Sequence, residues 1–291
     1  MTGWQPSVSV VVPVFNGVAT IDDCVQSLLQ LRYPAERLKV IVVDNGSGDG
    51  TIEALRRYGQ RIVVTQARRR GPAPARNAGM RCGAGEVVAF TDADCVVEPN
   101  WLAWLVDALE DPRVGVAGGP IRALPGANEI ERFGETIHDH RKAMVVYNPP
   151  YAVTGNWASR RSVLLSLGGF DERLRRGQDV DLSYRVVQSG YALAFVPEAI
   201  VYHHNEDTLP GLFREGFRHG FYAVQVRKRH DAFLADFGYR TVHLSAYADI
   251  ITKLMGSFRE GDIRSRCEAV FGAGKKAGTV AGSIRFGRLD L

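Results

Sequence analysis

The sequence predicts an α/β fold in which a doubly wound, Rossmann-like mixed sheet is followed by a C-terminal helical extension. Two observations predict this class. Short runs rich in β-branched residues alternate with segments whose apolar residues recur at helical spacing, and the connections between them are short. Hydrophobic residues make up 45% of the 291 positions, which is enough for one large core or two smaller ones.

The first third of the chain alternates most regularly. A valine-rich run from Val8 to Val12 stops at Pro13, as expected of a strand buried on both faces of a parallel sheet. Between Val18 and Leu31 the apolar residues recur at helical spacing. The alternation predicts further strands at Lys39–Val43, Arg61–Thr65 and Glu86–Thr91, and helices from about Gly50 and at Ala73–Cys82.

The rest of the chain is less regular until it becomes mainly helical after Thr208. We expect helices at Trp101–Glu110 and Glu129–Val146, a strand at Val114–Ala117, and further elements at Ser162–Leu167, Val180–Gln188, Ala192–Val196 and Ile200–Tyr202. The stretch Gly272–Gly278 is either a flexible or a packed tail.

The composition limits which classes of partner and which cellular compartments are expected. The formal charge of +4 is too small to require nucleic acid, so no nucleic-acid partner is expected, although its sign suits an anionic ligand. The four cysteines show no CxxC spacing, which favours a reduced cytoplasm. The chain has no basic start followed by an apolar run and no apolar stretch of about 18 residues. We therefore expect neither export nor a transmembrane anchor.

Two carboxylates, Asp92 and Asp94, follow the buried run Val87–Phe90 directly. Ligands of open α/β sheets bind beyond the carboxyl ends of the strands. Mg²⁺ and Mn²⁺ prefer oxygen ligands, commonly one or two carboxylates completed by substrate phosphates. The pair therefore predicts a divalent metal site, and the alternative is a solvated turn whose aspartates cap the next helix.

Four motifs in this order resemble the family 2 glycosyltransferases of the GT-A fold, over about residues 8–220. They are Val10-Val11-Val12-Pro13-Val14-Phe15-Asn16, Val42-Val43-Asp44-Asn45-Gly46-Ser47-Gly48-Asp49-Gly50-Thr51, Ala75-Arg76-Asn77-Ala78-Gly79 and Asp92-Ala93-Asp94. The resemblance implies an inverting, metal-assisted transfer of a sugar from a nucleoside diphosphate sugar to an acceptor hydroxyl. It also implies a nucleotide-sugar-binding half at 1–95, an acceptor-binding half at 96–230 and a helical extension at 231–291.

By this resemblance, Asp44 accepts a hydrogen bond from the base of the nucleotide. A carboxylate suits the ring N–H of uracil or thymine and equally the donors of guanine, and a UDP-sugar is the favoured donor. Pro13, Phe15 and Asn16 form the opposite wall, unless they are ordinary turn residues. Arg76 offers a guanidinium fork to phosphate or carboxylate, and Asp92 binds ribose or metal. Arg68, Arg69 and Arg70 are interpreted as solvated loop residues.

The resemblance places the catalytic base at Asp179, which removes the proton of the acceptor hydroxyl. Gln178 stands where the family usually has glutamate, and a neutral amide takes no proton at neutral pH. Asp181 is the second choice for the base. The alternative is that these residues only form the first turn of a helix, where acidic side chains are favoured.

The remaining assignments lie later in the chain. His203 is the expected third metal ligand, with His204 as the alternative. Asn156 and Trp157 are expected to bind the acceptor, although Trp157 is equally well explained as core filler. Arg218 is expected to neutralise the departing diphosphate.

The acceptor is a saccharide, a lipid-linked molecule or another small molecule, and the oligomeric state is not predicted. If the acceptor is a lipid, the basic run Arg227–His230 offers a peripheral contact with the inner face of a membrane; a solvated helix face is the alternative. Two other functions stay open. One is a non-catalytic carbohydrate- or nucleotide-binding protein of the same fold. The other is a sugar nucleotidyltransferase, which would need a Gly-rich phosphate loop that Pro13–Gly17 does not supply.

Overall fold

The computed structural model describes residues 3–239, 262–288 and 290, which divide into two compact units. The first unit, here the sheet unit, consists of Met1–Arg122 and His138–His204. The second, the helical unit, consists of Ala123–Ile137 and Asn205–Leu291. These boundaries differ from the functional division at residues 95 and 230, which stays a prediction.

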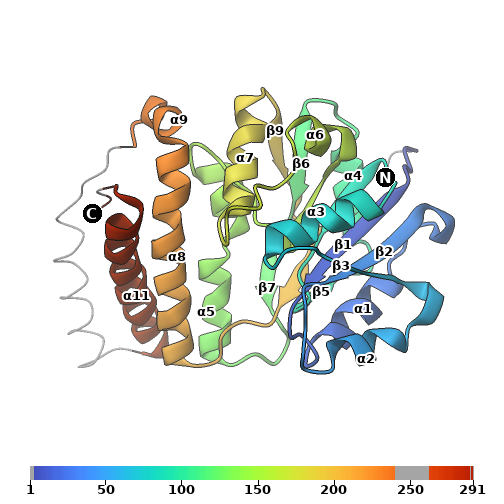
Figure 1. Cartoon of the computed structure of the whole chain (residues 1–291), viewed down its shortest axis with the longest axis horizontal. Helices are drawn as coiled ribbons and strands as arrows, with labels where there is room; N and C mark the ends of the chain where they lie inside the picture. The colour runs from blue at the N-terminus through green and yellow to red at the C-terminus, as the bar shows by residue number, and fades with distance from the viewer. Residues whose placement is uncertain (1–2, 240–261, 289, 291) are drawn as a thin grey trace. The chain divides into compact units, whose positions relative to one another are not determined.

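The sheet unit contains a mixed sheet of seven strands in the order β3-β2-β1-β4-β8-β6-β9 (Figure 1). β8 runs antiparallel to both β4 and β6, whereas the other neighbouring strands are parallel. The carboxyl ends of all strands except β8 therefore lie at one edge of the sheet. The strands are β1 (Val8–Val14), β2 (Leu38–Asp44), β3 (Val63–Gln66), β4 (Val87–Phe90), β6 (Val114–Gly118), β8 (Trp157–Arg160) and β9 (Ala192–Phe195).

Helices on both faces of the sheet produce two hydrophobic cores. Val10 and Val12 of β1 contribute to one core and Val11 to the other, because side chains alternate along a strand. The first core receives α1 (Ile21–Leu29), α2 (Thr51–Arg56) and α4 (Trp101–Ala108), and the second α3 (Pro72–Cys82), α6 (Arg161–Ser166) and α7 (Gln178–Gln188). Short 3-10 turns lie at η1 (Ala35–Arg37), η2 (Gly59–Arg61) and η4 (Thr154–Asn156). The predicted doubly wound class is confirmed.

A second sheet, in the order β5-β10-β7, begins directly after the carboxylate pair. Its strands are β5 (Cys95–Val97), β10 (Val201–His203) and β7 (Ile121–Ala123). β5 and β10 are antiparallel, and His203 lies opposite Cys95. Neither β5 nor β7 was predicted, because three residues are too few to show a period.

The prediction of one helix over Glu129–Val146 is wrong in one respect, because the segment forms two helices. α5 (Glu129–Ile137) ends before Asp139, and a π-helical segment, η3, spans Lys142–Val146. The Asp139 carboxylate accepts a hydrogen bond from the backbone N–H of Lys142 at 2.9 Å, which is the bond of an N-terminal cap. A new helix therefore starts there.

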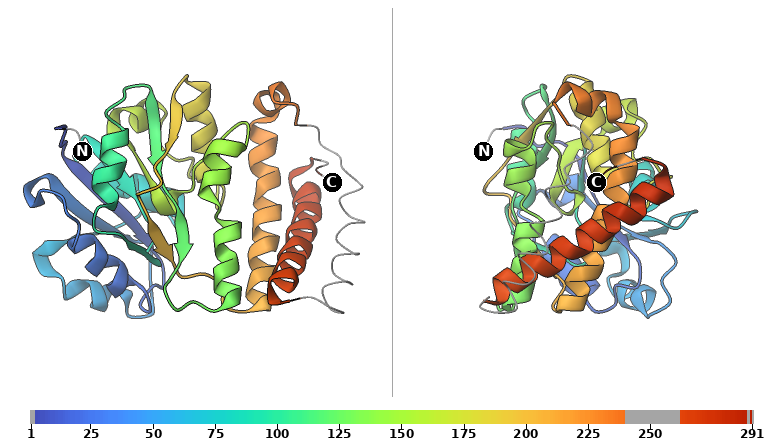
Figure 2. Two further views of the ribbon diagram at one scale, coloured as in Figure 1. Left: turned by 180° about the vertical axis from the view of Figure 1, so that it is seen from behind. Right: turned by 90° about the vertical axis from the view of Figure 1, so that its left-hand side faces the viewer.

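The helical unit is built on the long helices α8 (Leu209–Arg229) and α11 (Ile263–Phe286), which lie side by side (Figure 2), together with α5 and α9 (Asp231–Asp236). A Cβ at Gly278 would lie 2.0 Å from the carbonyl oxygen of Phe217, so only glycine allows this backbone approach. The stretch Gly272–Gly278 is therefore part of a packed helix. Of the predicted extension at 231–291, residues 240–261 lie outside the described residues. Among the helices that the structure describes, none has the length and apolar character to cross a membrane.

Candidate active site

The loops after β1 and β2 are tied together at the carboxyl edge of the large sheet. The backbone N–H of Asn16 donates to the Ser47 hydroxyl at 2.9 Å. The Asn16 side-chain oxygen accepts from the backbone N–H of Gly48, also at 2.9 Å. Asn16 adopts a positive φ of 52°, a conformation that asparagine tolerates better than most residues. These bonds hold the loop that carries Phe15 against the loop that follows Asp44.

Asp44 ends β2 and is only 1% exposed. Its carboxylate accepts hydrogen bonds from the backbone N–H groups of Gly46 at 3.0 Å and Ser47 at 3.2 Å. A carboxylate has about four acceptor positions, so this geometry leaves capacity for a ligand donor. Pro13 lies within β1, opposite Val43 and half-buried, so it shapes the strand end rather than projecting from it.

Phe15 is 52% exposed, and the guanidinium of Arg70 lies over its ring at 5.5 Å. Arg70 also lies beside Gly46, because a Cβ placed on that glycine would be 3.6 Å from the arginine Nε. Arg70 is exposed, as the interpretation of a solvated loop residue expects. Its position after β3, whose carboxyl end shares the edge of β1 and β2, makes it a further candidate residue for the site.

Arg76 and Asp92 form an ion pair at this edge, in which the arginine is buried and the aspartate side chain is 30% exposed. Nη2 of Arg76 lies 2.5 Å from Oδ1 of Asp92, and the arginine side chain is 4% exposed. Within the described part of the chain, the Nε and Nη1 atoms of Arg76 are buried without a hydrogen-bond partner. An unpaired buried N–H group is costly, so these two donors favour an acceptor supplied by a ligand.

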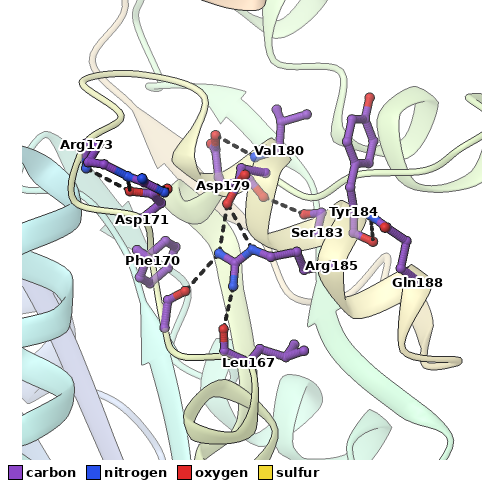
Figure 3. Close-up of polar contacts among 12 residues, drawn as sticks. Leu167, Phe170, Asp171, Arg173, Asp179, Val180, Ser183, Tyr184, Arg185 and Gln188 are labelled. Atoms are coloured by element: carbon purple, nitrogen blue, oxygen red, sulfur yellow. Dashed lines mark hydrogen bonds and ion pairs between the residues drawn. The ribbon is translucent and has the colours of Figure 1, made fainter. Parts of the chain in front are cut away.

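Asp179 lies in the first turn of α7 (Figure 3). It is within electrostatic range of both Arg76 and Asp92. Burial raises the pKa of the Asp179 carboxyl above its ordinary value, while the positive charge of Arg76 opposes the increase. Asp179 Oδ1 accepts a hydrogen bond from the backbone N–H of Val180 at 2.9 Å. The carboxylate is therefore held by its own helix and remains half-buried.

Asp181, the second choice for the base, forms a buried structural ion pair with Arg185. Its fully buried carboxylate lies 2.8 Å from Nη2 of Arg185. The same guanidinium donates to the carbonyl oxygens of Leu167 at 2.7 Å and Gly169 at 2.8 Å (Figure 3). Asp181 and Arg185 thus anchor α7 to the preceding loop, which leaves Asp179 as the carboxylate near Arg76.

The Asp92-Ala93-Asp94 segment turns sharply into β5. The backbone N–H of Cys95 donates to the carbonyl oxygen of Asp92 at 3.1 Å. Oδ1 of Asp94 lies 3.5 Å from Nε2 of His203. Burial raises the pKa of Asp94, and the charge of Asp92 adds to the increase while His203 opposes it. An oxygen and an imidazole nitrogen at this separation fit a divalent cation.

His204 lies next to this cluster, and its backbone N–H donates to the carbonyl oxygen of Asp94 at 2.9 Å. Its Nε2 is buried without a hydrogen-bond partner among the described residues. The 3.5 Å contact with Asp94 supports His203 as the ligand, and His204 stays the alternative.

The structure does not present Asn156 and Trp157 to an acceptor, because both side chains are 0% exposed. The Asn156 amide donates to the carbonyl oxygens of Pro120 and Ala199 and accepts from Nε1 of Trp101 at 2.8 Å. Trp157 starts β8 and packs edge-on against Phe170. Asn156 therefore connects the backbone segments at Pro120 and Ala199. Trp157 lies in the core, which agrees with its alternative interpretation as core filler. Their contact with an acceptor stays a prediction that the burial does not favour.

Arg218 lies in α8 of the helical unit, with Nη1 3.5 Å from a carboxylate oxygen of Glu215. Its role at the diphosphate stays a prediction. The basic run Arg227–His230 closes the same helix, and Arg227 pairs with Asp290 at 2.8 Å.

The fold and the carboxyl-edge site define a GT-A nucleotide-sugar enzyme. Residues 9–168 match the model of "Glycosyl transferase family 2". The glycosyltransferase AglE of Haloferax volcanii is 31% identical over 232 residues, covering 78% of this chain and 76% of its own. The pre-mycofactocin glycosyltransferase of Mycobacterium tuberculosis is 32% identical over 235 residues, covering 77% of this chain but only 48% of its own. The chain belongs to glycosyltransferase family 2 and is a glycosyltransferase.

Solved structures share the fold. A mannosyltransferase of Pyrobaculum calidifontis, in complex with GDP-Man and Mn²⁺, superposes with a TM-score of 0.69 at 22% identity, covering 96% of this chain and 88% of its own. Residues 1–349 of TarS of S. aureus, in complex with UDP-GlcNAc, give 0.58 at 17% identity, covering 97% and 92%. The GT-A prediction is confirmed. The family match favours a glycosyltransferase over the two other functions, a sugar nucleotidyltransferase and a non-catalytic binding protein.

Proposed function

We propose that this glycosyltransferase moves a sugar from a nucleoside diphosphate sugar to an acceptor hydroxyl with inversion at the anomeric carbon, using Asp179 as the general base. The observation that carries the proposal is the ion pair of Arg76 with Asp92, which leaves two buried guanidinium nitrogens without partners within range of Asp179. Donors of this kind match the oxygens of a diphosphate.

The donor-binding role rests on the tied loops after β1 and β2. Asp44 accepts hydrogen bonds from the base of the nucleotide, and Phe15 with Arg70 forms a flat wall beside it. Asn16 and Pro13 hold this wall in position. A carboxylate fits uracil and guanine alike, and the two solved neighbours carry GDP-Man and UDP-GlcNAc. We retain a UDP-sugar as the first donor to test.

The residues Asp94 and His203, with Asp92 beside them, would hold Mn²⁺ or Mg²⁺. Bound there, the cation supplies positive charge that stabilises the diphosphate as it leaves. The solved neighbour with GDP-Man also carries Mn²⁺, which supports the same choice here.

Asp179 takes the proton of the acceptor hydroxyl as the oxygen attacks the anomeric carbon on the face opposite the diphosphate. The single displacement then inverts the anomeric configuration. The raised pKa of Asp179 makes its carboxylate a stronger base than an exposed aspartate.

The test compares Asp179→Asn with Asp111→Asn in a donor panel with Mn²⁺. We expect Asp179→Asn to lower kcat by about 10²- to 10⁴-fold, with the nucleoside diphosphate affinity within about twofold of the original. Asp111 is a partly exposed aspartate that precedes β6, at the opposite edge of the sheet, so its variant should keep full activity. Normal turnover by Asp179→Asn would refute the base assignment. Failure of every nucleoside diphosphate to raise Tm in the presence of Mn²⁺ would refute the donor assignment.

A further inference from the structure

A thiol lies in the same cluster as the carboxylate and imidazole of the candidate metal site. One carboxylate oxygen of Asp94, the Sγ of Cys95 and one ring nitrogen of His203 all lie within 4.8 Å of one another. The Asp94 Oδ1 atom is 3.9 Å from Sγ of Cys95 and 3.5 Å from Nε2 of His203. Zn–O, Zn–N and Zn–S bonds of about 2.0 to 2.3 Å at a tetrahedral angle place two ligand atoms about 3.5 Å apart. Two of the three pairs are therefore close to ligand spacing.

The backbone explains why the thiol and the imidazole converge. Cys95 begins β5 and His203 ends β10, and the two residues lie directly opposite each other in this antiparallel pair. Side chains of such a pair project from the same face of the sheet. The sharp turn from Asp92 to Cys95 brings the Asp94 carboxylate to the same place.

The space beside the thiol is shared with the other carboxylate. A Cβ placed on Gly155 would lie 3.5 Å from Oδ2 of Asp92 and 3.9 Å from Sγ of Cys95. Both atoms therefore border the small volume that this glycine leaves open. Cys95 is 0% exposed, so a cation bound there would be shielded from solvent on the side of the sulfur.

We propose that Cys95 is a metal ligand, so that the site has oxygen, nitrogen and sulfur donors and binds thiophilic divalent cations, Zn²⁺ and Cd²⁺, more tightly than Mn²⁺ or Mg²⁺. This inference rests on the metal role of Asp94 and His203 in the proposed function. Thiolate selects zinc-like cations, whereas carboxylate alone suits Mg²⁺ and Mn²⁺. Zn²⁺ is therefore expected to displace Mn²⁺ from the protein.

The first experiment adds Cd²⁺ to the full chain and follows the ultraviolet charge-transfer absorption of a cadmium–thiolate bond. Exposed Cys82 is replaced by serine in every sample, because it would bind Cd²⁺ by itself. The proposal expects the band to appear with one equivalent of Cd²⁺ and to be absent in Cys95→Ser. Cys24→Ser is the matched control, because Cys24 is also buried and its Sγ lies 3.4 Å from the carbonyl oxygen of Asp92. A band that persists in Cys95→Ser, or no band in the parent, overturns the proposal.

The second experiment separates this inference from the proposed function by measuring Mn²⁺ binding directly by electron paramagnetic resonance. Serine keeps an oxygen donor, so Cys95→Ser should keep Mn²⁺ affinity within about threefold and lose at least about tenfold in Zn²⁺ affinity. A merely structural role would weaken both ions alike or neither, and either result overturns the proposal. Absence of Mn²⁺ binding to the parent would instead count against the metal role in the proposed function. If Cys95→Ser does not fold by circular dichroism, His203→Asn decides, because loss of the cadmium–thiolate band there supports the shared site and its full retention overturns it.

Discussion

Acidification is expected to destabilise the sheet unit through one buried histidine, His140. This residue is 1% exposed, and its Nδ1 lies 2.7 Å from the carbonyl oxygen of Gly119 while Nε2 accepts from the backbone N–H of Val153 at 2.8 Å. The two bonds together place the proton on Nδ1, and acceptance by Nε2 requires the neutral ring. Burial lowers the pKa of His140 from 6.5 to about 4, against the opposing effect of the bond to Gly119.

The lower folded pKa fixes the direction of the effect. As the pH falls below 6.5, the unfolded chain binds the extra proton first, so stability is complete above that pH and is lost between about pH 6.5 and pH 4. The full difference corresponds to about 3 kcal/mol, of which about 2 kcal/mol is lost between about pH 7.5 and pH 5.

The assay is urea unfolding of the parent and His140→Gln at both pH values, followed by tryptophan fluorescence. All four tryptophans, Trp4, Trp101, Trp104 and Trp157, lie in the sheet unit. Glutamine offers one donor and one acceptor and does not titrate. On acidification, the free energy of unfolding of the parent should fall by about 2 kcal/mol more than that of the variant, because the remaining titratable groups affect both proteins equally. Parallel losses in the two proteins would refute the lowered pKa.

Two further predictions concern the helix pair and the base. Gly278→Ala should destabilise the protein by about 1–3 kcal/mol in thermal or urea unfolding, because its Cβ would meet the Phe217 carbonyl oxygen at 2.0 Å. Gly272→Ala in the same helix, where a Cβ meets nothing within 4 Å, should stabilise it by up to about 1 kcal/mol; equal effects would contradict the close packing. The acid limb of the kcat/KM profile should lie above that of an ordinary aspartate, and Arg76→Gln should move it higher, because the arginine charge lowers the pKa of Asp179. A limb that Arg76→Gln leaves unmoved would contradict that coupling.

The parts of the fold predicted from sequence are those where local pattern and tertiary role agree. β1, β2 and β4 are valine-rich because they are buried on both faces, and their burial is visible in the residues themselves. β8 was missed because Trp157-Ala158-Ser159-Arg160 has neither alternation nor β-branched residues. It is a strand because β4 and β6 bond to it from both sides. The break before η3 was missed although its cap, the bond from Lys142 to Asp139, is local, because aspartate is also found within helices.

The candidate site residues also divide into those that the sequence predicted and those that depend on the fold. Asp92 and Asp94 were predicted from their position after a buried strand, and Asp179 and His203 from the resemblance. Asp181 and Arg185 lie four residues apart on α7, so their pairing is a local contact that helical spacing allows, whereas the packing of Trp157 against Phe170 depends on the fold. The positions of Arg70 and Cys95 also depend on the fold. The stacking of Arg70 on Phe15 and the pairing of Cys95 with His203 are products of the sheet order.

Under the proposed function, charge balance gives a reason for a cation beside the diphosphate. Asp92 pairs with Arg76, Asp179 lies within range of the charge of Arg76, and the charge of Asp92 helps raise the pKa values of Asp94 and Asp179. A diphosphate would add further negative charge to this excess, at a place where burial strengthens each repulsion. A divalent cation held by Asp94 and His203 would offset this negative charge. The free N–H groups of Arg76 can then bind the diphosphate oxygens while Asp179 stays available to take a proton.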